Sequence, residues 1–155
     1  MEDAAGSVRA ARLVEGLRAA EASLVAVLET VPAERWNAQP DASTWSIGKD
    51  AEHVADAAVY HQWIVRLTIG EKVSSKRPAI ERTVLTTPLT QDEIIALIRE
   101  RTNEGGFLIG GLGDAQLALT TKPPRARDQK LGDTIALVLI AHYGTHQADI
   151  ERKLG

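Results

Sequence analysis

The sequence lacks several residue types and patterns, and each absence excludes a class of protein. It contains no cysteine, so disulfides, zinc–thiolate sites, iron–sulfur clusters and cysteine nucleophiles are excluded within this chain. It has no run of about 18 apolar residues, the length that a transmembrane helix requires. Its net charge is −3, with no stripe of Lys and Arg, so we expect neither a nucleic-acid partner nor a membrane partner.

Length and composition predict one globular domain over residues 1–155. Apolar residues make up 44% of the chain and charged residues 25%, the usual proportions for a domain that can bury a sizeable core. The first residues are acidic and the segment carries charges throughout, without the basic start and apolar stretch of a signal peptide. We therefore expect a cytoplasmic enzyme or binding protein.

Apolar residues recur at helical spacing in four segments, and none shows the alternation of a half-buried strand. The pattern predicts helices over residues 7–29, 46–69, 90–111 and 131–154. The last of these is apolar nearly all round in its first half, which is typical of a central, buried helix. We therefore predict an all-α fold, a four-helix bundle. Predicted start signals are N-caps at Ser7 and Ser46 and a capping box from Thr90 to Glu93.

Two long polar connections join these helices. Residues 70–89 form a predicted crossover between the second and third helices, long enough to let those two helices run parallel. Residues 112–130 form a second predicted loop before the last helix. We expect the shapes of these two loops to determine which substrate binds. The pair Gly105-Gly106 lies inside the third helix, where we expect it to weaken or bend the helix.

Three of the four histidines are placed where one metal ion could bind them. His142 and His146 are four residues apart, so on an α-helix both imidazoles turn to the same side. A third imidazole from a facing helix would complete a three-nitrogen site. The alternative is that the histidines are packed core residues, but two adjacent buried imidazoles without partners cost about 1–3 kcal/mol each. The spacing therefore favours a metal site.

Periodicity leaves His53 and His61 as alternatives for the third ligand, because both lie on the non-polar side of the second helix. If the second and fourth helices are antiparallel, His53 comes to the height of the histidine pair. His61 is two turns further along, so we expect it to be structural or to lie in the second shell. Asp149 and Tyr60 are further second-shell candidates: Asp149 could accept an outer N–H of a ligating histidine, and Tyr60 could reach the cavity.

Two motifs resemble those of the DinB/YfiT family of small bacterial metal-binding four-helix bundles. A tryptophan lies eight residues before the first histidine, and an H-x-x-x-H pair lies late in the last helix. The order and lengths of the predicted helices also fit nearly the whole chain. The residues that carry the resemblance are Trp45-Ser46-Ile47, His53-Val54, and His142-Tyr143-Gly144-Thr145-His146-Gln147 leading to Ile150.

The resemblance implies an up-down-down-up bundle that binds a divalent metal through His53, His142 and His146, and it selects His53 over His61. Imidazole ligands suit several divalent ions, of which we expect zinc or nickel. Members of this family with assigned activities are S-transferases or isomerases that use low-molecular-weight thiols such as mycothiol or bacillithiol, and a homodimer is also implied. Gln147 departs from the arginine that many relatives carry at that place.

Three hypotheses of function follow. The first is a metal-dependent enzyme that activates a thiol or water against a small-molecule substrate, as a thiol transferase, an isomerase or a hydrolase. Since the chain has no cysteine, a thiol would come from a cosubstrate. The second is a non-catalytic, stress-related protein that binds a metal or a small molecule. The third is a dimeric interaction module in which the histidines are merely packed.

Overall fold

The computed structural model describes residues 6–78, 88–122 and 128–155, and within these residues the fold is all-α. The only β pairing among them is an isolated antiparallel bridge between Thr120 and Lys130. Parts of both long connections, residues 79–87 and 123–127, lie outside the described residues. The helices are α1 (Val8–Glu29), α2 (Ala33–Trp36), α3 (Ile47–Thr68), α4 (Gln91–Gly110), α5 (Asp114–Leu117), α6 (Leu131–Thr134), the π-helix η1 (Ile135–Ile140) and α7 (Ala141–Leu154).

The predicted start signals of three helices are confirmed. The side chains of Ser7 and Ser46 accept hydrogen bonds from the backbone N–H groups of Ala10 and Lys49. Thr90 and Glu93 form the reciprocal capping box that opens α4. Each cap satisfies backbone donors that have no partner inside the helix, so the helices begin within a residue or two of where the sequence predicts.

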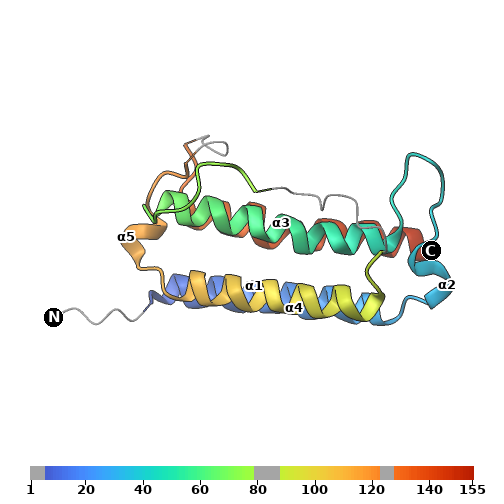
Figure 1. The fold of residues 1–155 in the computed structure, drawn as a ribbon. Coiled ribbons are helices and arrows are strands. Elements are labelled where there is room, and N and C mark those ends of the chain that lie inside the picture. The colour runs from blue at the N-terminus through green and yellow to red at the C-terminus, as the bar shows by residue number, and fades with distance from the viewer. Residues whose placement is uncertain (1–5, 79–87, 123–127) are drawn as a thin grey trace.

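The long helices pack as two layers around one core (Figure 1). α1 and α3 each pack against both α4 and α7. Leucine and isoleucine side chains from all of these helices are fully buried between them, which removes their apolar surface from water and stabilises the fold. Within the described residues, no helix is both long and apolar enough to cross a membrane.

The structure differs from the sequence prediction in three helical details. The last helix is not a uniform α-helix, because Ile135–Ile140 forms a π-helical segment just before α7. The stretch from residue 34 to 44 is a loop by its sequence pattern, but its first residues belong to the short helix α2 (Ala33–Trp36), and α5 lies inside the second predicted loop. By contrast, α4 runs through the pair Gly105-Gly106 to Gly110, close to the predicted end at residue 111.

α2 fixes the carboxyl end of α7. The Arg35 guanidinium donates hydrogen bonds to the carbonyl oxygens of Lys153 and Leu154, which have no partner within the helix. Trp36 is 3% exposed and packs directly over Gly48 in the first turn of α3. The short helix therefore ties the start of α3 to the end of α7.

Candidate metal centre

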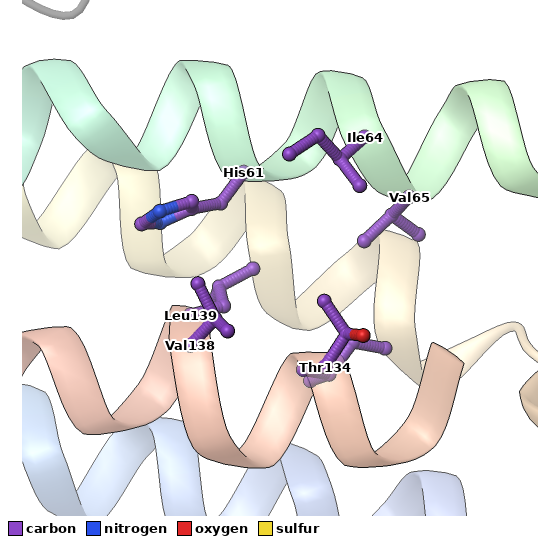
Figure 2. A pocket seen from close by; sticks show the side chains of 7 residues that line it. His61, Ile64, Val65, Thr134, Val138 and Leu139 are labelled. Carbon is purple, nitrogen blue, oxygen red and sulfur yellow. The ribbon is translucent and has the colours of Figure 1, made fainter. Parts of the chain in front are cut away.

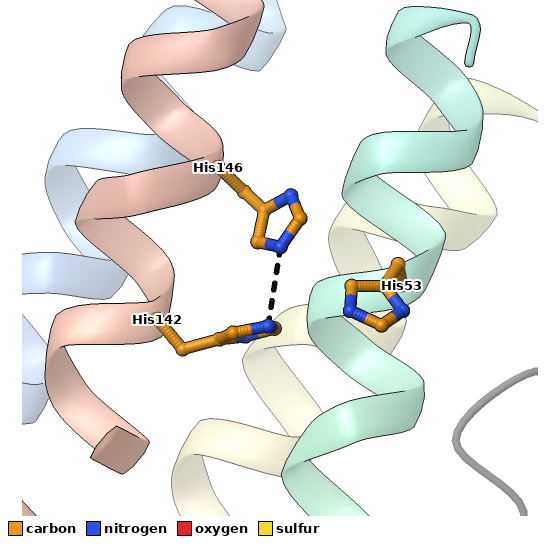
Figure 3. A group of neighbouring side chains, drawn as sticks. All are labelled: His53, His142 and His146. Carbon is orange, nitrogen blue, oxygen red and sulfur yellow. Dashed lines mark hydrogen bonds between the residues drawn. The ribbon is translucent and has the colours of Figure 1, made fainter. Parts of the chain in front are cut away.

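The structure brings together His53 from α3 and His142 and His146 from α7 (Figure 3). The ring centroid of His53 lies 5.1 Å from that of His142 and 4.9 Å from that of His146. One ligating atom from each of the three lies within 4.8 Å of the others. All three side chains are half-buried, so the cluster lies in the wall of the bundle and not in its sealed core.

The two histidines of α7 face each other through the nitrogens that would bind a metal. Their Nε2 atoms lie 3.1 Å apart, as the dashed line in Figure 3 shows. With a metal–nitrogen distance of about 2.05 Å, two nitrogens at this separation would subtend about 100° at a shared ion. That angle lies between the ideal tetrahedral and octahedral values. The Nε2 atoms of His142 and His146 are therefore spaced as two ligands of one divalent ion, and His53 supplies the third nitrogen of the group.

Contacts along α3 and the last helix show that the two run antiparallel. Asp50, near the start of α3, contacts Lys153 at the end of α7. The ring of His61, further along α3, contacts the ring of His142 at the start of α7. Val65 near the end of α3 lines the same cleft as Thr134. This register brings His53 level with the histidine pair.

The π-helical segment η1 determines which side of α7 the histidines occupy. Its wider turns take up extra residues, so every side chain after it is shifted around the helix axis. The buried apolar stripe along η1 and α7 consists of Ile135, Leu139, Tyr143 and Ile150. His142 and His146 lie beside that stripe, half-buried and turned toward α3. They are therefore both held by packing and accessible from solvent.

A carboxylate that the sequence analysis did not single out contacts the site. Asp50 Oδ1 lies 3.3 Å from His146 Nδ1, and Lys153 Nζ donates to Asp50 Oδ2. Burial by itself raises the pKa of Asp50, but the hydrogen bonds from His146 and Lys153 outweigh it and hold that pKa below its ordinary value of 3.8. Asp50 is thus ionised at neutral pH. Its position three residues before His53, one helical turn, was the available signal.

Asp149 contacts a different partner from the one we expected. Its carboxylate pairs with Arg152 on the surface of α7. Asp50, His146 and Asp149 do form a second group that could hold a metal. Lys153 already pairs with Asp50 and Arg152 with Asp149, so side-chain cations neutralise both carboxylates. The three-histidine group is therefore the better candidate.

Of the other two residues expected to support the ligands, His61 lies beside His142, and Tyr60 packs on His61. The sequence analysis placed His61 below the level of the pair, but its ring centroid is 5.2 Å from that of His142. Tyr60 packs on His61 and stacks on Trp63, and the Arg77 guanidinium lies over its ring. On the opposite side, Trp45 packs 5.1 Å from His53, ring centroid to ring centroid.

A narrow apolar cleft lies next to the histidine cluster, between α3 and η1 (Figure 2). His61 forms one end of it and is the side chain that links the cleft to His142. Apart from His61 and Thr134, the lining is aliphatic, so a group bound there would be held by apolar contact. The lining residues are His61, Ile64, Val65, Thr134, Ile135, Val138 and Leu139.

An all-helical fold with a cluster of three histidines defines this chain as a helical protein with a candidate metal site. The family model described as the DinB superfamily matches residues 17–150, and the chain belongs to that superfamily. The match spans the described helices from the middle of α1 to near the end of α7, including all three histidines. No curated protein and no solved structure matches the chain significantly.

Proposed function

We propose that this protein binds one divalent metal ion through His53, His142 and His146 and uses it in catalysis. The observation that carries the proposal is the Nε2 to Nε2 distance of 3.1 Å between His142 and His146, with His53 completing the group. Three neutral imidazoles leave coordination positions open, as is usual for catalytic and not for structural metal sites. Zinc or nickel is the ion we expect.

When bound, a divalent ion here would supply Lewis-acid activation of a thiol or a water molecule. The thiol would belong to a low-molecular-weight cosubstrate, because the chain contains no cysteine. His61 would lie beside a bound substrate, because its ring contacts that of His142. The reaction proposed is a thiol transfer or isomerisation, with hydrolysis as the outcome if water replaces the thiol.

We also propose the up-down-down-up order of α1, α3, α4 and α7, and a homodimer. Support for the order comes from the antiparallel contacts of α3 with the last helix and from Figure 1. There α1 and α7 run one way along the bundle, and α3 and α4 run the other. The homodimer rests on the family resemblance, and sedimentation of the purified protein would test it.

Metal content of single-histidine variants tests the metal site. We expect about one ion per chain in the wild type and little in His53→Ala, His142→Ala or His146→Ala. His61→Ala is the matched control, because it removes an imidazole that contacts His142 without belonging to the three-histidine group. Metal content unaffected by His142→Ala would overturn the proposal.

Catalysis is tested separately, by assaying the metal-loaded protein with several small thiols and electrophiles. Turnover that is lost in His142→Ala, and that returns when metal-stripped wild-type protein is reloaded, supports the proposal that this protein is an enzyme. A protein that holds its metal tightly but shows no metal-dependent turnover would instead be the non-catalytic binding protein.

A further inference from the structure

Asp50 is placed to act on the metal site through His146. Its carboxylate is buried, with a side chain 4% exposed, and its two oxygens have different partners. Oδ1 faces His146 Nδ1 at 3.3 Å, and Oδ2 accepts from Lys153 Nζ. His146 lies 96 residues away in the sequence, so the contact forms only when α3 and α7 pack together.

The chemistry of the two groups fixes where the proton of His146 resides. An ionised carboxylate can only accept hydrogen bonds, so His146 must carry its proton on Nδ1 to bond with Asp50. A neutral imidazole has one N–H and one lone pair. The lone pair of His146 then lies on Nε2, the nitrogen that faces His142 Nε2 at 3.1 Å. That is the tautomer that a metal requires there.

Lys153 holds the carboxylate in this position. Its ammonium group neutralises Asp50 and is itself mostly buried, with a side chain 16% exposed. A buried carboxylate without such a partner would carry a large desolvation cost. The neighbouring cation Arg152 does not serve this purpose, since it pairs with Asp149 and its side chain is 72% exposed.

We propose that Asp50 is a positioning residue, which holds His146 as the Nδ1-protonated tautomer with Nε2 aimed at the metal, and that Lys153 fixes the Asp50 carboxylate for this purpose. The inference rests on the metal site proposed above. It assigns a role to a residue that the sequence analysis did not single out, and it makes Asp50, His146 and Lys153 one connected unit across α3 and α7.

Asp50→Asn is the most specific variant, because it keeps the size of the side chain but replaces one acceptor oxygen with an NH₂ donor. Asparagine has one acceptor oxygen, and Lys153, which can only donate, would take it. The amide NH₂ would then face His146 Nδ1 and drive the ring to the Nε2-protonated tautomer. We expect zinc or cobalt affinity to fall about 10- to 100-fold, the usual effect of losing an outer partner of a metal ligand.

Two readouts separate positioning from a general loss of structure. Nitrogen-15 NMR of the metal-free protein, above the usual histidine pKa of about 6.5, reports the tautomer of each ring. We expect Nδ1–H for His146 in the wild type and Nε2–H in Asp50→Asn. The visible spectrum of the cobalt-loaded protein should change in Asp50→Asn, since the ligand geometry changes with the ring.

Matched controls come from the neighbouring surface pair. Asp149→Asn and Arg152→Met alter a carboxylate and a cation on the same helix face, and we expect both to keep wild-type metal affinity. Lys153→Met should weaken binding, by less than Asp50→Asn, because His146 still has its acceptor.

Outcomes for the two proposals are distinguishable. A wild type that binds no metal overturns the metal site itself. A wild type that binds metal through His142, with Asp50→Asn equal to it in affinity and tautomer, overturns only the role of Asp50. If Asp50→Asn does not fold, the wild-type tautomer decides: Nε2–H at His146 overturns the inference, and Nδ1–H supports it.

Discussion

The hydroxyls of Thr102 and Tyr143 form a buried pair, and Tyr143 directly follows the candidate metal ligand His142 in the sequence. The two oxygens are 3.0 Å apart, and the residues are 0% and 2% exposed. Burial raises the pKa of the Tyr143 phenol, which keeps it protonated. One buried hydrogen bond thus joins α4 to α7.

Removing both members of this pair should cost less than the sum of the costs of removing each one alone. Tyr143→Phe and Thr102→Val each leave a buried hydroxyl without its partner, which costs about 1–3 kcal/mol. The double variant removes both polar groups, so we expect it to be more stable than the sum of the two single effects predicts. Urea denaturation of the four proteins measures this. Strictly additive changes would show that the two hydroxyls do not interact.

Two glycines in helices illustrate how packing between elements overrides helix propensity. Gly48 lies in the first turn of α3, where an added Cβ would come 2.6 Å from Trp36 Nε1. Gly144 lies in α7 between the two histidines, and an added Cβ there would meet nothing within 4 Å. An alanine would therefore meet the Trp36 ring at residue 48 and open space at residue 144.

We expect Gly48→Ala to destabilise the protein and Gly144→Ala to stabilise it. Alanine gains up to about 1 kcal/mol over glycine inside a helix. At residue 48 a clash with the buried Trp36 ring, of about 1–3 kcal/mol, outweighs that gain. Thermal unfolding of both variants gives the signs. Equal stabilisation at the two positions would mean that α2 moves freely away from α3.

At the scale of the whole molecule, a bound metal would link the two helices that supply its ligands. α3 contributes His53 and α7 contributes His142 and His146, so unfolding either helix destroys the site. A ligand that binds only the folded state stabilises it according to its concentration and affinity. The rise in the free energy of unfolding on adding metal therefore reports metal binding.

Adding zinc at about 100 times its dissociation constant should stabilise the wild type by about 2.7 kcal/mol. For a domain of this size that corresponds to a rise in Tm of about 5–11 °C. His142→Ala should show no such rise, and chelation should reverse it in the wild type. Identical melting with and without metal would favour the third hypothesis, a bundle in which the histidines are only packed.

The predictable parts of this protein are those that depend on neighbours along the chain. Ser7, Ser46 and the pair Thr90 and Glu93 bond to backbone groups within one turn, so their motifs can be recognised by spacing alone. The pairing of His142 with His146 is also local, being one helical turn. Periodicity could not choose between His53 and His61, because both lie on the non-polar side of the second helix; the choice came from an assumed antiparallel register and from the resemblance to a family.

The sequence by itself determined an all-α chain, where its long helices begin, and that two histidines share one side of the last helix. Only the tertiary structure decided the rest. The π-helical segment η1 and the fold of α2 over Gly48 are set by packing. Asp50 meets Lys153, 103 residues away, only through the register of α3 against α7. Capping and periodicity act within a turn or two of helix, whereas such contacts depend on how separate helices fit together.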